Sequence, residues 1–173
     1  TVTGVGYEPK GEFLLKERSL NPIDGTDLQT LLRIATLCND AKLENEEGKW
    51  EVKGDFTEGA LIVAAAKASL RKEDLEKEEP RIGEVPFSSE RKRMTTIHDL
   101  AERGKLAYMK GAPEIVLRQC SKIIKDGEIQ KITVEDREDL LRTTEAMATQ
   151  ALRNLGFAYR ELPETTRVFD EAI

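Results

Sequence analysis

Hydrophobic residues recur along the chain with two different periods, which predict helices in some segments and strands in others. Apolar residues lie three or four positions apart in the segments that we expect to be helical, which are 24–38, 57–70, 113–118 and 133–152. Asp24 or Thr26 suits the N-cap of the first helix, and Thr133 suits that of the last. The charged run 71–79 is expected to form a solvated helix end or a loop.

Short apolar runs bounded by turn residues predict strands in most of the remaining segments. They lie at 1–7, 12–15, 50–52, 81–87, 94–100, 106–110 and 156–161, and a hairpin is expected over 122–131 around Asp126-Gly127. Further hairpins are expected to join 1–7 to 12–15 and 94–100 to 106–110, with a polar turn at 44–49. Strands outnumber helices and most neighbours are joined by hairpins. The chain is therefore predicted to have an α+β (mixed α/β) fold, with a largely antiparallel sheet flanked by helices.

Composition narrows the class of protein. Of the 173 residues, 39% are hydrophobic and 35% are charged, which predicts one soluble domain spanning 1–173. The formal net charge of −6 argues against a nucleic-acid-binding surface. Cys38, Cys120 and the single histidine, His98, cannot form a usual zinc site, so no metal ligands are expected and the cysteines are interpreted as buried free thiols. The longest apolar run, 60–66, is far shorter than the roughly 18–20 residues that span a bilayer, and no direct membrane contact is expected.

Three short segments carry the candidate chemistry. In Lys110-Gly111-Ala112-Pro113-Glu114, a lysine at the end of an apolar strand is followed by a glycine, which lets a ligand approach the backbone, and by a proline that suits the first position of a helix. These five residues are equally compatible with an ordinary strand-to-helix turn. The other two segments, 54–61 and 86–94, contain the sequences Gly-Asp-Phe-Thr-Glu-Gly and Pro-Phe-Ser-Ser-Glu-Arg-Lys-Arg-Met.

In this order and spacing, the three segments resemble the nucleotide-binding domain of P-type cation-transporting ATPases. The sequence Ala-Leu-Arg-Asn-Leu-Gly-Phe-Ala-Tyr-Arg at 151–160 resembles the arginine-bearing segment late in that domain, so the resemblance covers nearly the whole chain. The chain is similar to the branch that moves calcium, sodium, potassium, protons or magnesium, because it lacks the His-Pro pair and the Gly-rich loop of the heavy-metal pumps. The family's phosphorylated Asp-Lys-Thr-Gly-Thr motif and its Gly-Asp-Gly-x-Asn-Asp magnesium motif do not occur in the sequence.

The resemblance implies that the chain is the ATP-binding domain of a larger pump, on the cytoplasmic side of a membrane, without a phosphorylation, actuator or transmembrane domain of its own. Such a domain holds the adenine of ATP, as Mg-ATP in the intact pump, and delivers the γ-phosphate to an aspartate on a separate phosphorylation domain. The expected partners are ATP, ADP and AMP, together with the phosphorylation and actuator domains of the same polypeptide, and the isolated domain is expected to be monomeric. No catalytic residue is expected, so the isolated domain should bind ATP without significant hydrolysis.

Two alternatives to this function stay open. One is a binding or regulatory module of the same fold that has lost strong nucleotide binding. The other is a small hydrolase that uses the paired carboxylates of Asp55 and Glu58. The transported ion cannot be deduced from this sequence.

The resemblance also implies which residues hold adenine. Phe87 would stack on the base, Lys110 would line the inner end of the adenine pocket, and Gly111 would let the base approach the backbone. The alternatives are a phenylalanine in the core and an ordinary exposed lysine at a strand end. Glu58 would accept a hydrogen bond from the adenine amino group, with Thr57 shaping the turn, although an acidic residue three positions earlier also gives the spacing of a capping box.

The remaining candidates lie around the phosphates and the ribose. Lys92 and Arg153 are the cations expected there, and their alternatives are a solvated turn and a charged helix end. Leu155 would flank the ring or belong to the core, and Ser88 belongs to the Phe-Ser motif. Animal calcium pumps carry an arginine where this chain has Ser89, so Arg91 or Arg93 is a candidate substitute for that phosphate contact.

Overall fold

The computed structural model describes residues 1–23, 26–101, 104–166 and 169–170, and it divides into two compact units, Thr1–Pro80 and Arg81–Ile173. The sequence prediction of a single domain over 1–173 concerns how these two units assemble, and it stays a prediction.

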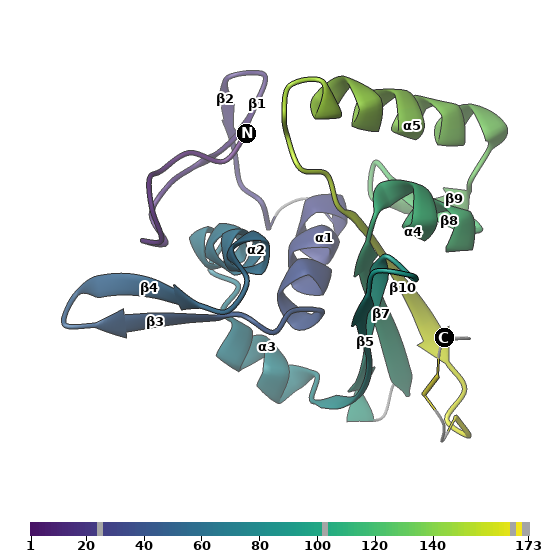
Figure 1. The fold of residues 1–173 in the computed structure, drawn as a ribbon, viewed down its shortest axis with the longest axis horizontal. Helices are drawn as coiled ribbons and strands as arrows, with labels where there is room; N and C mark the ends of the chain where they lie inside the picture. The colour runs from purple at the N-terminus through teal and green to yellow at the C-terminus, as the bar shows by residue number, and fades with distance from the viewer. Residues whose placement is uncertain (24–25, 102–103, 167–168, 171–173) are drawn as a thin grey trace. The chain divides into compact units, whose positions relative to one another are not determined.

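The first unit contains, within its described residues, three helices and two small antiparallel hairpins (Figure 1). The helices are α1 (Thr26–Leu37), α2 (Phe56–Lys67) and α3 (Lys72–Glu78), and the hairpins join β1 (Phe13–Leu15) to β2 (Arg18–Leu20) and β3 (Lys42–Glu46) to β4 (Lys49–Lys53). Helix α1 packs against both α2 and α3. The small side chains of Ala65 and Ala68 let Leu32 and Phe13 pack closely, and these four residues form a buried core.

The second unit is centred on a four-stranded antiparallel sheet in the order β10-β7-β6-β5. Its strands are β5 (Arg81–Ser88), β6 (Arg93–Asp99), β7 (Lys105–Gly111) and β10 (Gly156–Leu162). Helix α4 (Pro113–Gln119) packs against β7 and β10, and α5 (Val134–Ala148) packs against α4; the hairpin of β8 (Lys122–Lys125) and β9 (Glu128–Lys131) lies between the two helices in the sequence. Ile97, Ala107 and Leu162 form a buried cluster on one face of the sheet.

These elements confirm the predicted α+β fold and most of its helices and strands. Thr133 caps α5 in a capping box: its hydroxyl accepts the N–H of Asp136 at 3.1 Å, and its own N–H donates to the Asp136 carboxylate at 3.0 Å. The β8–β9 turn has positive φ at both Asp126 and Gly127, as the Asp-Gly sequence predicted. Helix α5 ends at Ala148 rather than continuing through 152, and Asp24 lies outside the described residues.

The predicted hairpin of 1–7 with 12–15 forms only at its first three residues, and its extension through residue 7 is wrong. Val2 forms an antiparallel bridge with Phe13, the Thr3 N–H donates to the Glu12 carbonyl oxygen at 2.9 Å, and β1 pairs with β2 as well. The turn between β1 and β2 consists of Lys16 and Glu17, which have positive φ of 48° and 67°. Gly4 also takes a positive φ of 98°, which ends the extended backbone after the first three residues.

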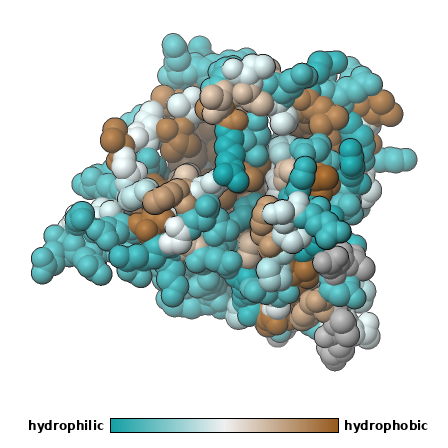
Figure 2. All heavy atoms as spheres, viewed as in Figure 1, coloured by the Kyte–Doolittle hydropathy of each residue, from teal (hydrophilic) through white to brown (hydrophobic). Residues whose placement is uncertain are grey.

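The prediction of a polar turn at 44–49 is also wrong, because most of this segment is paired in β3 and β4. Only Glu47 and Gly48 form the turn, again with positive φ at both residues. Figure 2 shows hydrophilic side chains toward the tip of this hairpin. Because β3 contains a single apolar residue, Leu43, the sequence has no apolar and polar alternation that would predict this strand. The charged run 71–79 contains a separate helix, α3, which buries Leu75.

Neither a membrane-spanning helix nor a cluster of metal-ligating side chains is found among the described residues. Cys38 is a buried free thiol, as predicted, whereas Cys120 is a free thiol that is only half-buried. Burial raises the pKa of the Cys120 thiol, which keeps it protonated at neutral pH.

Candidate functional site

Phe87 lies in an irregular part of β5, where the pairing with β6 shifts by one residue between Val85 and Ser88. The extra residue makes a β-bulge, in which Pro86 and Phe87 together stand opposite Met94. Proline is tolerated there because β5 is an edge strand of the described sheet. The Phe87 side chain is 60% exposed, so the alternative of a core phenylalanine is wrong and the ring is presented to solvent.

Lys110 lies at the same end of the sheet, opposite Met94 on one side and Phe157 of β10 on the other. Because directly opposed residues in antiparallel strands share a face, these three side chains lie on one face of the sheet. Phe87 is two strands away from Lys110, a separation of about 10 Å between the strands. We call Phe87, Met94, Lys110 and Phe157 the transverse row. The Lys110 side chain is only 7% exposed, so the alternative of an ordinary exposed lysine is wrong.

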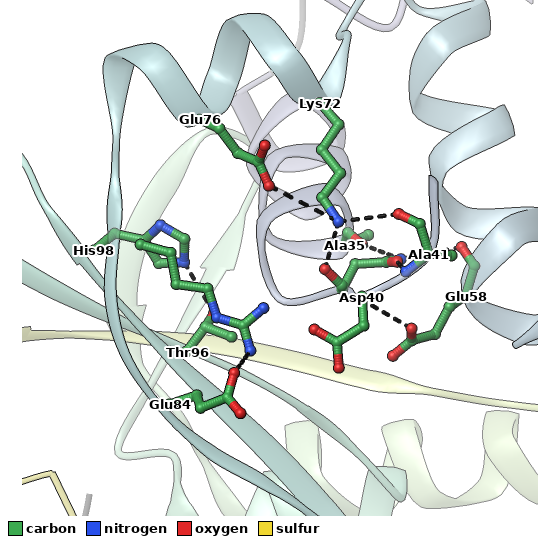
Figure 3. A network of polar contacts seen from close by, with 11 residues as sticks. Ala35, Asp40, Ala41, Glu58, Lys72, Glu76, Glu84, Thr96 and His98 are labelled. Carbon is green, nitrogen blue, oxygen red and sulfur yellow. Dashed lines mark hydrogen bonds and ion pairs between the residues drawn. The ribbon is translucent and has the colours of Figure 1, made fainter. Parts of the chain in front are cut away.

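Further along the face that carries Lys110, the sheet has a buried polar layer. Thr96 is paired with Tyr108, and Nε2 of the fully buried His98 lies 2.9 Å from Oγ1 of Thr96 (Figure 3). The His98 and Tyr108 rings are 5.1 Å apart between centroids. These buried contacts stabilise β6 and β7, the two strands that carry Met94 and Lys110 of the transverse row.

Gly111, which ends β7, has a packing reason to be glycine. A Cβ built on it would lie 2.5 Å from the carbonyl oxygen of Lys92 and 2.7 Å from the Cβ of Arg93, closer than atoms can approach. The N–H of Ala112 also donates to the Lys92 carbonyl oxygen at 2.9 Å. The turn after Lys110 is therefore tied to the β5–β6 turn, and a role for Gly111 toward a base stays a prediction.

The three consecutive basic residues of the β5–β6 turn differ in how far their side chains are exposed. Arg91 is only 9% exposed, and its Nη1 donates to the carbonyl oxygen of Pro86 at 3.1 Å. Lys92 is exposed, with a positive φ of 51°, and its N–H donates to the Ser88 carbonyl oxygen at 2.8 Å. Arg93 is half-buried at the start of β6. Lys92 is thus the one of the three that presents its side chain to solvent.

Glu58 lies in the first turn of α2, in the first unit. The helix is capped by Asp55, whose Oδ1 accepts the N–H of Thr57 at 2.8 Å and that of Glu58 at 3.1 Å, as the spacing predicted. Thr57 and Glu58 are both half-buried. The Glu58 carboxylate reaches the loop that follows α1, where its Oε2 accepts the N–H of Asp40 at 2.9 Å (Figure 3).

Asn39 ties this loop to α2 and Lys72 ties it to α3, and the sequence did not reveal the role of either residue. The Lys72 ammonium donates to the carbonyl oxygens of Asn39, at 2.6 Å, and Ala41, at 3.0 Å (Figure 3). The side-chain amide of Asn39 donates to the carbonyl of Glu58 at 3.0 Å and accepts the N–H of Ala41 at 2.8 Å. The backbone on both sides of Asp40, whose N–H contacts the Glu58 carboxylate, is therefore held by the side chains of Asn39 and Lys72.

Arg153 and Leu155 lie in the connection from α5 to β10. Arg153 is exposed, and Leu155 is half-buried directly before Gly156. Asn154, between them, donates its side-chain amide to the Thr144 carbonyl oxygen at 3.1 Å, which holds the connection against α5. This connection enters β10 at the end that pairs with the end of β7.

The second unit therefore brings an exposed aromatic ring, a buried lysine and an exposed cation, Lys92, to one end of a single sheet. This combination suits a flat aromatic ligand that carries negative charge. Met94 and Phe157, which complete the transverse row, were not identified from the sequence. Neither β6 nor β10 alternates regularly between apolar and polar residues, so their place in this row follows only once the strand register is known.

The chain belongs to the family described as P-type ATPase, cytoplasmic domain N, whose model matches residues 27–172. This membership confirms the resemblance and agrees with the α+β fold of the two units. The chain is an N domain of the kind found in P-type cation-transporting ATPases.

Three curated relatives illustrate the range of similarity. A calcium-transporting ATPase of Bacillus subtilis is 37% identical over 161 residues, covering 93% of this chain and 18% of that protein. The cation-transporting ATPase pma1 of Synechocystis is 40% identical over 163 residues, covering 91% and 18%. The probable cation-transporting ATPase F of Mycobacterium tuberculosis is 34% identical over 174 residues, covering 99% and 19%. The chain thus spans about a fifth of the length of these relatives.

Proposed function

We propose that the chain binds ATP by its adenine end and presents the γ-phosphate for transfer to an aspartate on a separate phosphorylation domain. The observation that carries this proposal is the transverse row, in which an exposed phenylalanine and a buried lysine occupy one end of one sheet. Family membership supports the same ligand. In the longer protein, we propose ATP-driven cation transport, with Mg-ATP as the nucleotide form and the phosphorylation and actuator domains as partners on the cytoplasmic side of a membrane.

Each predicted residue has a chemical role in this proposal. Phe87 stacks on adenine, Lys110 and Gly111 line the inner end of its pocket, and Leu155 flanks the ring. Glu58, set by the turn of Thr57, accepts a hydrogen bond from the adenine amino group. Lys92 and Arg153 attract the phosphates and the ribose side, and Ser88 shapes the turn that carries Phe87.

Binding by such a site is expected to be weak. One stacked ring and a few exposed polar contacts leave about 3–5 kcal/mol after the cost of association, which corresponds to a dissociation constant of roughly 0.1–10 mM. A nanomolar constant from calorimetry would contradict this, because it requires a far more enclosed ligand.

The decisive test is titration of the chain with ATP, before and after substitution of Phe87 by Ala. Loss of base stacking is expected to weaken binding by about 1–3 kcal/mol, or roughly 5- to 150-fold. The matched control is Ile129→Ala, which removes another apolar side chain of the same unit with almost the same exposure, 59%. Equal affinities of the parent and Phe87→Ala would refute the proposed role of the ring.

A second candidate function is a binding or regulatory module of this fold without strong nucleotide binding. The observation that favours it is Ser89, where related pumps of animal type carry a phosphate-contacting arginine. Amide chemical shifts separate the two functions: ATP moves the signals of Phe87 and Lys110 if the chain binds nucleotide and leaves them in place if it does not.

A further inference from the structure

An exposed ring on an edge strand binds a base well only if its backbone is held still. Free rotation of the segment before binding would have to be lost on binding, which lowers affinity. The bulge at Phe87 interrupts the β5–β6 ladder, so the ladder alone does not fix this residue. We propose that Arg91 is a positioning residue for Phe87, which fixes the bulge and does not itself contact phosphate. This inference rests on the proposed function and extends it to the residue that prepares the site.

The guanidinium of Arg91 acts on the peptide that enters Phe87. Its Nη1 donates to the carbonyl oxygen of Pro86 at 3.1 Å. That oxygen and the backbone nitrogen of Phe87 belong to one planar peptide unit. Fixing the oxygen therefore fixes the plane from which the Cα of Phe87 projects. Arg91 is 9% exposed, so water competes little for this hydrogen bond.

The backbone of the same turn holds Ser88, the residue that follows Phe87. The N–H of Arg91 donates to Oγ of Ser88 at 3.2 Å, and the N–H of Lys92 donates to the Ser88 carbonyl oxygen at 2.8 Å. The Lys92 carbonyl oxygen in turn accepts the N–H of Ala112 at 2.9 Å, just after the end of β7. The turn thus links the bulge of Phe87 to the strand of Lys110, which sets the spacing between the two ends of the adenine site.

Their different burial gives Arg91 and Lys92, two basic residues of this turn, different roles. Lys92 is exposed and has the freedom to follow a phosphate, whereas Arg91 lies inside the turn that it stabilises. A planar guanidinium presents several donors in fixed directions, and a lysine ammonium at the same position does not reproduce that geometry. The arginine that related pumps carry at the position of Ser89 is therefore not replaced by Arg91.

The test compares AMP with ATP, because the two nucleotides share adenine and differ in phosphate charge. Dissociation constants of the chain for both are measured by chemical-shift titration, which reaches millimolar values. Arg91→Met is expected to raise the dissociation constants for AMP and for ATP by the same factor, about three- to tenfold. Lys92→Met is expected to weaken the binding of ATP more than the binding of AMP. Arg118→Met, an exposed arginine at the end of α4, is the matched control and should change neither.

A double-mutant cycle shows whether Arg91 acts through Phe87. In a Phe87→Leu background, which lacks the aromatic ring but keeps the strand apolar, Arg91→Met should cause no further loss of AMP affinity. Arg91→Lys provides a second variant that keeps the charge, and it is expected to weaken AMP as well. Circular dichroism establishes that each variant is folded, and Arg91→Lys carries the test if Arg91→Met is not.

Three outcomes overturn the inference while leaving the proposed function in place. They are a larger loss for ATP than for AMP in Arg91→Met, an undiminished further loss in the Phe87→Leu background, and full AMP affinity in the folded Arg91→Lys variant. Failure of the unaltered chain to bind either nucleotide is a different result. It overturns the proposed function itself and, with it, the role assigned to Arg91.

Discussion

Glu58 is held at two points, because Asn39 donates to its carbonyl oxygen and Asp40 donates to its Oε2. A carboxylate accepts several hydrogen bonds, so this anchoring is compatible with acceptance of a further one from the adenine amino group. Guanine presents a carbonyl oxygen at the corresponding position, and two acceptors repel each other. We therefore expect Glu58→Gln to weaken ATP binding several-fold and to narrow the difference between ATP and GTP, as measured by parallel titrations.

The control for this prediction is Glu114→Gln, which neutralises an exposed carboxylate in the first turn of α4. It changes the net charge by the same amount and should leave the ratio of ATP to GTP affinity unaltered. A Glu58→Gln chain that kept the parental ratio would show that the carboxylate does not select the base.

Motifs were enough to propose the residues of the candidate site, but they did not predict the burial or the contacts of these residues. Composition alone favours a buried phenylalanine and an exposed lysine, and the structure shows the reverse, with 60% exposure for Phe87 and 7% for Lys110. The reversal comes from a bulge on an edge strand and from pairing on both sides of β7. These are properties of strand register, which a single sequence does not specify. For the same reason, the links from Asn39 and Lys72 to the Glu58 loop could not be predicted.

At the scale of elements, the clearest prediction concerns the start of α5. The Thr133 hydroxyl accepts the N–H of Asp136, so it satisfies one of the backbone donors at the helix terminus. Thr133→Ala is expected to lower the free energy of unfolding by about 1 kcal/mol, measured by urea denaturation. Thr143→Ala, at an exposed position within the same helix, is the control and should be neutral or slightly stabilising, because alanine favours helix.

The same cap predicts a dependence on pH. Hydrogen bonds from the side chain and backbone of Thr133 lower the pKa of Asp136 below its ordinary value of 3.8. A carboxyl whose pKa is lowered by folding stabilises the folded state above its unfolded pKa, and this contribution is lost as pH falls through the folded pKa. The difference in stability between the parent and Asp136→Asn should therefore be largest near neutral pH and shrink below about pH 3.8. A difference that persisted unchanged in acid would contradict the role of the ionised cap.

Elements with strong local signals were predicted well, and those without them were not. Helix α2 and the β8–β9 hairpin follow from an apolar run and an Asp-Gly turn. In contrast, the β1–β2 turn uses Lys16 and Glu17, two residues that rarely adopt the positive φ both of them have. The β3–β4 hairpin also lacks an apolar stripe at its tip. Where pairing overrides local preference, sequence periodicity does not reveal the strand.

At the scale of the whole molecule, the chain is expected to bind ATP without consuming it. Phosphoryl transfer depends on a nucleophile in line with the γ-phosphate and on metal ions that neutralise its charge. The family's phosphorylated Asp-Lys-Thr-Gly-Thr motif and its magnesium motif do not occur in this sequence. The residues that we propose for ATP binding would contact adenine or attract phosphate, and both are positioning roles.

Phosphate release from Mg-ATP in the presence of the chain should therefore equal the rate in buffer, even at nucleotide concentrations that saturate binding. Chemical-shift titration on the same sample establishes that ATP is bound while the phosphate assay runs. A contaminating ATPase would give activity that is unaffected by substitutions in this chain. Robust turnover that disappears in Lys110→Glu would instead place the complete reaction in these 173 residues. That result would require a nucleophile or general base from the chain itself, and the paired carboxylates of Asp55 and Glu58 would then be the first residues to substitute.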